Sequence, residues 1–286
     1  MRIANIIMAH KAPEQLERLI IKMNHPMFDF YIHLDKKSDF ESFKYLGSMD
    51  NVFFITNRIE CNWGGYSFVK AILCSVKEVL NSTVKYDFIN LMSAQDYPIK
   101  PVEEMYNFLS GHKGMSFISY EFFDGTWWKH AVTRFRSYHF TDYKLKGKYL
   151  LQKIVNKLMP QRKFPLNLKL YGSSNSSWWI LSFEAAEYLI DFIEKNVKLN
   201  KFMQYTWGSD EFLIATILLN SPFKERIINN NLRYIDWSKG GAHPKILSKD
   251  DLQKLMNTDK FFARKFDVSM DPEILDLIDL HHKTPL

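Results

Sequence analysis

A carboxylate with the chemistry of a general base lies in the segment Gly208–Glu211. A transfer reaction onto a hydroxyl group needs one carboxylate to take the proton from that hydroxyl as its oxygen attacks. Aromatic neighbours of Glu211 could raise its pKa towards neutrality by keeping water away from the carboxyl. The same segment is also typical of a helix start, with Ser209 as the N-cap and Asp210 and Glu211 in the first turn. The residues alone leave both interpretations open.

Basic residues near the C-terminus could bind an anion. The segment GGAHPK supplies Lys245, and the segment ARKF supplies Arg264 and Lys265. Fixed cations of this kind stabilise a diphosphate that gains negative charge as a bond to it breaks. A solvent-exposed basic turn is the alternative, and for isolated lysines it is the commoner one.

Polar side chains follow three apolar runs that are typical of buried strands. His10 follows the first run, Asp35 the second, and Ser93 and Asp96 the third. The carboxyl ends of parallel strands meet at one edge of an open sheet, where ligands bind. We therefore expect a nucleotide at this edge, unless Asp35 only begins the turn before the lysines that follow it.

The segment Trp63–Ser67 (WGGYS) directly precedes a predicted helix. Its paired glycines allow close backbone approach, and Ser67 could be the N-cap. A phosphate or a ribose could lie against this loop, although a tight turn with a packed tryptophan is the simpler alternative. The segment lacks the glycine spacing of dinucleotide-binding and P-loop sites, which disfavours a dehydrogenase and a P-loop enzyme.

The elements that must position these residues alternate in the first half of the chain. The predicted strands are Ile3–Ala9, Phe28–Leu34, Val52–Thr56 and Tyr86–Met92, and the predicted helices are Pro13–Met23 and Ser67–Leu80. This order indicates an α/β fold with a mostly parallel sheet covered by helices on both faces.

The later half is less uniform. Residues 121–170 are rich in aromatic and basic residues without a clear period, which is typical of a long excursion that is functional or partly disordered. Regular patterns return in a strand at Trp178–Leu181 and in helices at Glu184–Val197 and Ser209–Leu219. We expect a single domain, 1–286, with a nucleotide-binding half (1–120), the excursion (121–170), and a half for the acceptor and catalysis (171–286).

Composition excludes several classes of protein. The chain has 286 residues, of which 46% are hydrophobic and 24% charged, so it is long enough to bury a sizeable core. Its net charge of +6 is modest, no basic stripe or RNA-binding motif occurs, and no nucleic-acid partner is expected. The two cysteines, Cys61 and Cys74, favour a reducing compartment and make a poor metal site.

Seven motifs in order resemble the core-2/I-branching β-1,6-N-acetylglucosaminyltransferase and peptide O-xylosyltransferase family (glycosyltransferase family 14). They are MAHK at 8–11, YIHLDKKS at 31–38, WGGYS at 63–67, INLMSAQDYPIK at 89–100, GSDEFLIATILLNS at 208–221, LRYIDW at 232–237 and FFARKFD at 261–267. The resemblance implies a GT-A-type fold and an inverting transfer from a UDP-sugar without a metal or other cofactor. In keeping with this, no D-x-D motif, the usual metal site of such folds, occurs in the sequence.

The resemblance also implies roles for individual residues. It makes Glu211 the base and places Lys245 and Lys265 on the diphosphate. The full set of donor residues that we predict is Ile7, His10, Asp35, Trp63, Ser93, Lys245, Arg264 and Lys265. The predicted acceptor residues are Trp237, which aligns with an acceptor-stacking tryptophan of the family, together with Trp178, Trp179 and Asp96.

We expect transfer of N-acetylglucosamine to a hydroxyl of a glycan acceptor. The alternatives are a UDP-xylose-dependent xylosyltransferase and a non-catalytic carbohydrate-binding protein, the latter favoured if Glu211 is exposed and remote from any pocket. The composition and the resemblance lead us to expect a bacterial, cytoplasmic protein at the inner face of the membrane. Its basic and aromatic excursion, Thr126–Lys169, could rest on anionic lipid.

Overall fold

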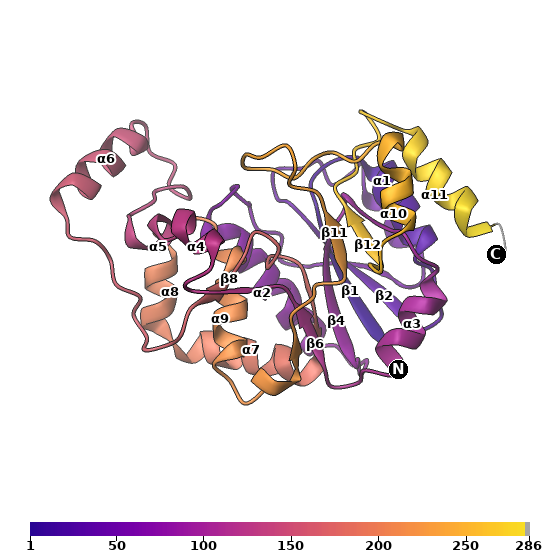
Figure 1. Ribbon diagram of the computed structural model, residues 1–286, viewed down its shortest axis with the longest axis horizontal. Helices are drawn as coiled ribbons and strands as arrows, with labels where there is room; N and C mark the ends of the chain where they lie inside the picture. The colour runs from indigo at the N-terminus through magenta and orange to yellow at the C-terminus, as the bar shows by residue number, and fades with distance from the viewer. Residues whose placement is uncertain (284–286) are drawn as a thin grey trace.

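The structure, a computed structural model, describes residues 1–283 (Figure 1). Its main sheet has seven strands in the order β10-β6-β9-β4-β1-β2-β3, and β9 alone among them is antiparallel to its neighbours. The strands are β1 (Ile3–Ala9), β2 (Phe28–Leu34), β3 (Val52–Phe54), β4 (Phe88–Ser93), β6 (Ser116–Ile118), β9 (Trp179–Ser182) and β10 (Ile227–Ile228). The predicted α/β class with a mostly parallel sheet is confirmed.

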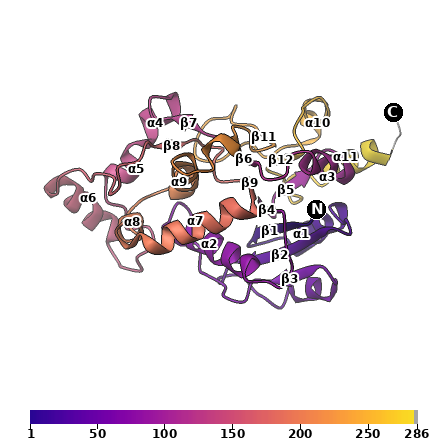
Figure 2. The same cartoon turned by 90° about the horizontal axis from the view of Figure 1, so that it is seen from below.

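Helices cover both faces of this sheet. Alternate residues of β1 point to opposite faces, so Ile6 packs in one core and Ile7 in the other. The first core holds α2 (Tyr66–Leu80), α7 (Phe183–Lys195), α8 (Val197–Met203) and α9 (Leu213–Leu219). The second core holds α1 (Pro13–Lys22), α3 (Val102–Ser110), α10 (Leu252–Met256) and α11 (Glu273–Lys283). Figure 2 shows α2 and α7 lying side by side, away from α3 and α11.

A second, three-stranded sheet brings the C-terminal part of the chain to the end of β4. Its order is β11-β12-β5, with β5 (Asp96–Pro98), β11 (Arg233–Ile235) and β12 (Phe262–Arg264). The register of β12 against β5 places Arg264 opposite Asp96. Residues that are far apart in the sequence therefore meet at one edge of the main sheet.

The excursion at 121–170 is more ordered than its sequence indicates. It contains β7 (Glu121–Phe122), which pairs with β8 (Tyr171–Gly172), and the helices α4 (Thr126–Ala131), α5 (Thr133–Arg136) and α6 (Lys148–Leu158). Aromatic and arginine contacts, which have no fixed period, hold it in place. For example, Arg162 donates to the Tyr205 carbonyl over 2.6 Å and lies 3.8 Å above the Phe202 ring.

Both helix starts that we assigned to serines are wrong. Helix α2 begins after Gly65, and Ser67 lies inside it, where its amide and hydroxyl donate to the Asp142 carboxylate over 2.8 and 2.6 Å. Ser209 begins a short 3₁₀ turn, Ser209–Glu211, which is separate from α9. The Asp142 carboxylate, which belongs to the excursion, therefore accepts a backbone amide at the start of α2. The local sequence predicted this capping role for Ser67.

No helix within residues 1–283 is long and apolar enough to cross a bilayer.

Candidate active site

A cavity of about 650 Å³ opens at the carboxyl ends of the central strands. The register of the sheet pairs Met8 with Ser93 and Ala9 with Leu34, so β1, β2 and β4 end level with one another. The ends of β11 and β12 and the loop before α9 complete the walls. The predicted site residues that line this cavity are His10, Asp35, Trp63, Ser93, Trp178, Glu211, Trp237, Arg264 and Lys265.

Four predicted site residues lie elsewhere. Ile7 and Trp179 are fully buried in the two cores because their side chains point into the layers of helices rather than along the strand ends. Asp96 is fully buried behind the cavity wall between two arginines. The Lys245 ammonium is 2.6 Å from Asp251 Oδ1, an ion pair that holds it outside the lining of the cavity. These four side chains therefore do not face the ligand space.

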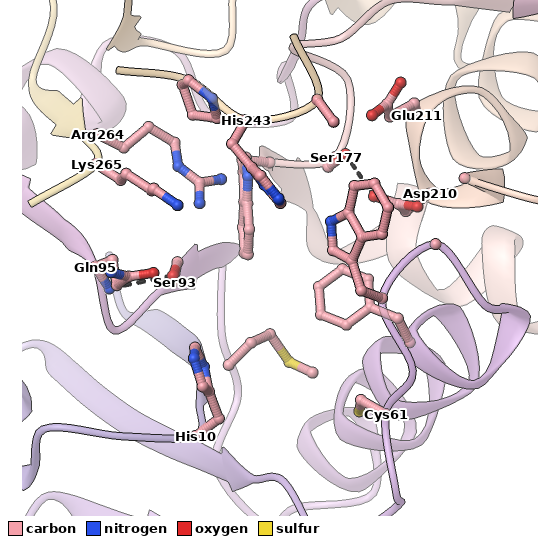
Figure 3. Close-up of a pocket in the computed structure, with 18 of the residues that line it drawn as sticks. His10, Cys61, Ser93, Gln95, Ser177, Asp210, Glu211, His243, Arg264 and Lys265 are labelled. Carbon is pink, nitrogen blue, oxygen red and sulfur yellow. Dashed lines mark hydrogen bonds between the residues drawn. The ribbon is translucent and has the colours of Figure 1, made fainter. Parts of the chain in front are cut away.

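Glu211 faces the cavity from the turn before α9, opposite Arg264 and Lys265 (Figure 3). Its side chain is only 19% exposed, and Arg134 Nη1 donates to Glu211 Oε2. The Arg134 guanidinium is in turn held between two indoles, 5.0 Å from the Trp127 ring and 4.6 Å from the Trp207 ring. Burial raises the pKa of Glu211 to about 7, although the nearby Arg134 charge opposes this rise. A carboxylate poised near neutral pH is suited to proton transfer.

Asp210 lies beside Glu211 but is held differently. Ser177 Oγ donates to Asp210 Oδ2 over 2.6 Å, and the residue is half-buried. Burial raises the pKa of Asp210, and the Ser177 hydroxyl counteracts that rise. Within residues 1–283 Glu211 has no such hydroxyl partner, and the Arg134 guanidinium donates to its carboxylate instead.

Positive charge is concentrated on the β12 side of the cavity. Arg264 Nε is 3.3 Å from Asp96 Oδ1, and Arg233 Nε is 3.6 Å from Asp96 Oδ2. Two guanidinium groups thus share one buried carboxylate, which leaves an excess positive charge. The Arg264 guanidinium lies 4.2 Å above the Trp178 ring and lines the cavity, so this excess faces the ligand space.

Lys265 adds a second cation on the same side. Partial burial and the neighbouring Arg264 charge lower the pKa of Lys265, because both disfavour its charged form. A bound anion would relieve this cost. Arg264 and Lys265, rather than Lys245, are therefore the cations on this side that face the ligand space.

The opposite wall, at the ends of β1 and β2, contains Asp35. Asp35 is buried, and its Oδ1 accepts the Lys37 amide over 2.9 Å, as expected for a turn-forming aspartate. Its Oδ2 is 3.9 Å from the Lys37 ammonium, and both residues line the cavity. Asp35 thus forms the turn and also borders the ligand space, so its two interpretations do not exclude each other.

Aromatic rings border the outer part of the cavity. Trp63 is exposed and lies edge-on to Trp207, with ring centroids 5.1 Å apart, and His243 lies 5.0 Å from Trp63. Trp237 is fixed by an indole hydrogen bond of 2.8 Å to Asn175. Sugar rings pack their apolar faces against such indoles.

The paired glycines of the WGGYS loop are explained by packing within the protein. Gly64 has φ of +70°, and a Cβ atom there would lie 2.2 Å from the Trp207 indole nitrogen. A Cβ atom on Gly65 would lie 2.1 Å from Asp142 Oδ1. Close approach of a phosphate is thus not needed to account for either glycine.

Sequence reasoning missed several residues of the site. Arg134 and Trp127 lie in the aperiodic excursion, where no pattern distinguished them from other aromatic and basic residues. His243 lies between the glycines and Lys245 in a segment that we interpreted only through its lysine. The basic and aromatic composition of the excursion was the one feature of the sequence that indicated a contribution to the site.

No group of three or more His, Cys, Asp or Glu side chains among the described residues is arranged to hold a metal ion.

Comparison with known proteins identifies the family. The model of the Core-2/I-Branching enzyme family matches residues 3–257. The chain belongs to this family. Similar proteins include xylosyltransferase 2 from Rattus norvegicus, 28% identical over 98% of this chain and 33% of the relative. Xylosyltransferase 1 from Rattus norvegicus is 27% identical over 97% of this chain and 35% of the relative.

The family member described here spans about a third of the length of these curated relatives. Among solved structures, mouse xyloside xylosyltransferase 1 in its apo form has a TM-score of 0.43 and 11% identity, covering 92% of this chain and 97% of the other. The S. aureus TarS 1–349 structure has a TM-score of 0.41 and 12% identity, covering 98% of this chain and 65% of the other.

Proposed function

We propose that this family member is an inverting glycosyltransferase that moves a sugar from a UDP-sugar to a hydroxyl group of a glycan or protein acceptor. The observation that carries the proposal is the geometry of one cavity. Glu211, whose pKa is raised to about 7 by burial, lies opposite Lys265 and Arg264, and Arg264 shares the single Asp96 carboxylate with Arg233. A non-catalytic carbohydrate-binding protein would be favoured if Glu211 were exposed and remote from any pocket. Glu211 is instead largely buried and lines the cavity.

In the proposed reaction the acceptor oxygen attacks the anomeric carbon of the donor sugar. Glu211 takes the acceptor proton as the new carbon–oxygen bond forms, and the bond from that carbon to the diphosphate breaks. The bonding electrons leave with UDP, whose growing negative charge is stabilised by Arg264 and Lys265. A single displacement of this kind inverts the configuration at the anomeric carbon.

Arg134 is a positioning residue in this scheme. Its contact with Glu211 and its place between two indoles orient the carboxylate towards the cavity. The positive charge also keeps part of the Glu211 population ionised near neutral pH, since it opposes the effect of burial on the pKa.

Two donor sugars are in question. The motifs are common to both branches of the family, and we expected N-acetylglucosamine from the sequence. The relatives at 28% identity are named xylosyltransferases and favour xylose. We propose UDP-xylose as the donor to be tested first, with UDP-N-acetylglucosamine as the alternative, because the named relatives match nearly the whole of this chain.

The proposal is tested by calorimetric titration of the purified protein with UDP, UDP-xylose, UDP-N-acetylglucosamine and nucleotide sugars of other bases. Saturable binding of UDP and of one UDP-sugar supports it, and release of UDP with an acceptor glycan establishes transfer. Preference for a nucleotide other than uridine would contradict the donor assignment.

Binding of UDP should not need a divalent metal, because Arg264 and Lys265 supply positive charge at the diphosphate position. We expect the UDP dissociation constant to be the same with EDTA and with added Mg²⁺ or Mn²⁺. A loss of binding on chelation, restored by either metal, would show that a metal ion holds the diphosphate.

The rate of transfer should rise with pH and level off above about 7, because burial raises the pKa of Glu211 to about 7 and only the carboxylate accepts a proton. Arg134→Gln removes a charge that lowers this pKa, so the midpoint of the acidic limb should move to higher pH. The measurement is kcat against pH. Arg136→Gln, an exposed change two residues further along the chain, is the matched control and should leave the midpoint in place. An unchanged midpoint in Arg134→Gln would remove Arg134 from the site.

A further inference from the structure

Helix α6 (Lys148–Leu158) stands apart from the rest of the fold. None of its residues is buried, and Figure 1 shows it at the far end of the molecule from α11. Its inner side is attached by polar contacts: Phe140 N donates to Gln152 Oε1 over 2.9 Å, and Tyr138 N donates to Asn156 Oδ1 over 2.7 Å. Hydrogen bonds thus attach one side of this eleven-residue helix. Its other side has no partner in the described structure.

The unpartnered side is apolar. Leu150, Ile154 and Leu158 follow one another at a spacing of four residues and therefore share one face. Their exposed fractions are 66%, 47% and 75%. Leu151 lies beside this stripe and is exposed as well. The hydrogen bonds of Gln152 and Asn156 lie on the opposite face of the helix. Exposed apolar residues gathered in this way mark an interaction surface.

The charge around the stripe indicates what covers it. Residues 143–169 contain eight Lys or Arg and no Asp or Glu. Lys153 and Lys157 lie along one side of the stripe on the helix, and neither makes an ion pair within residues 1–283. A protein partner would need to be both apolar and acidic on one surface, whereas an anionic bilayer offers both properties at its headgroup boundary.

We propose that α6 docks on an anionic membrane surface, with Leu150, Ile154 and Leu158 inserted at the headgroup boundary and Lys153 and Lys157 on the lipid phosphates. This inference goes beyond the proposed function, because docking requires neither donor nor transfer. The docked segment is joined to the active site: Lys144 pairs with Glu60 over 2.6 Å, and Asp142 accepts from Asn62, a cavity residue. The chain just before α6 therefore contacts the rim of the cavity.

The test is co-sedimentation of the whole chain with vesicles of phosphatidylcholine, either pure or containing phosphatidylglycerol as the minority lipid. We expect binding to the anionic vesicles that weakens with added salt. The triple variant Leu150→Gln/Ile154→Gln/Leu158→Gln should lower the partition coefficient at least about 100-fold, because three apolar side chains no longer leave water. Lys153→Gln/Lys157→Gln should lower it about 25-fold on anionic vesicles alone, at about fivefold for each lysine.

The matched control removes three exposed apolar side chains elsewhere, in the variant Ile21→Gln/Val197→Gln/Met270→Gln. It should bind vesicles as the unaltered chain does. A melting temperature close to that of the unaltered chain shows that each variant is folded. The proposal is overturned if the unaltered chain ignores anionic vesicles or if the α6 triple variant still binds them. It is also overturned if ultracentrifugation shows a dimer that only the α6 triple variant loses, since the stripe would then join two copies of the chain.

Discussion

Glu211→Gln should reduce kcat roughly a hundredfold to ten thousandfold while the affinity for the UDP-sugar stays close to that of the unaltered protein. Glutamine keeps the size of the side chain and its contact with Arg134, but it cannot accept the acceptor's proton. The measurement pairs steady-state transfer with calorimetric donor titration. Because the side chain is part of the cavity wall and not of either core, the melting temperature should change little.

A matched control distinguishes this role from ordinary helix-start chemistry. Glu184 is exposed in the first turn of α7, and Glu184→Gln should cost at most a few tenths of a kcal/mol of helix-dipole stabilisation. Its kcat should be unaltered. If Glu211→Gln behaved as Glu184→Gln does, with an intact rate, the base would lie elsewhere, and Asp210 would be the next carboxylate to test because it also lines the cavity.

Lys265→Ala should weaken UDP binding about 10- to 150-fold, which corresponds to the roughly 1.5–3 kcal/mol of a charge-assisted hydrogen bond. The ammonium lines the cavity beside Arg264, and no ion pair to Lys265 occurs among residues 1–283. A diphosphate would thus be its first strong partner. Titration of both proteins with UDP at one salt concentration measures the difference.

Lys245→Ala is the informative comparison, because the family resemblance assigns both lysines to the diphosphate. The Lys245 ammonium is bonded to Asp251, whose side chain is almost fully buried, so this variant should lose stability rather than affinity. We expect a lower melting temperature and a UDP dissociation constant within about twofold of the original. Weakened UDP binding in Lys245→Ala and normal binding in Lys265→Ala would reverse the assignment of the diphosphate site.

The main strands and helices could be predicted from the sequence because their signals are local. In β1 and β2 every residue is buried, and short runs of mostly apolar residues, IANIIMA and FDFYIHL, predict such strands directly. Helix α1 has its proline in the first turn and an apolar stripe, and it begins and ends close to the predicted residues. Polar residues that directly follow such strands must meet at one sheet edge, and this placed His10, Asp35 and Ser93 correctly at the cavity.

The remaining site residues depended on contacts between distant segments. Nothing local shows that Lys245 meets Asp251 while Lys265 faces the cavity, or that Asp142 rather than Ser67 caps α2. Arg134 comes to Glu211 from an excursion whose order rests on stacking of aromatic rings and guanidinium groups, which leaves no period in the sequence. Burial within the folded chain likewise decides that the pKa of Glu211 lies near 7.

The sequence by itself determined the sheet and the edge at which its polar residues gather, since both follow from hydrophobic periodicity. Only the tertiary structure decided which charges are neutralised and which face the ligand, because that depends on partners distant in the chain.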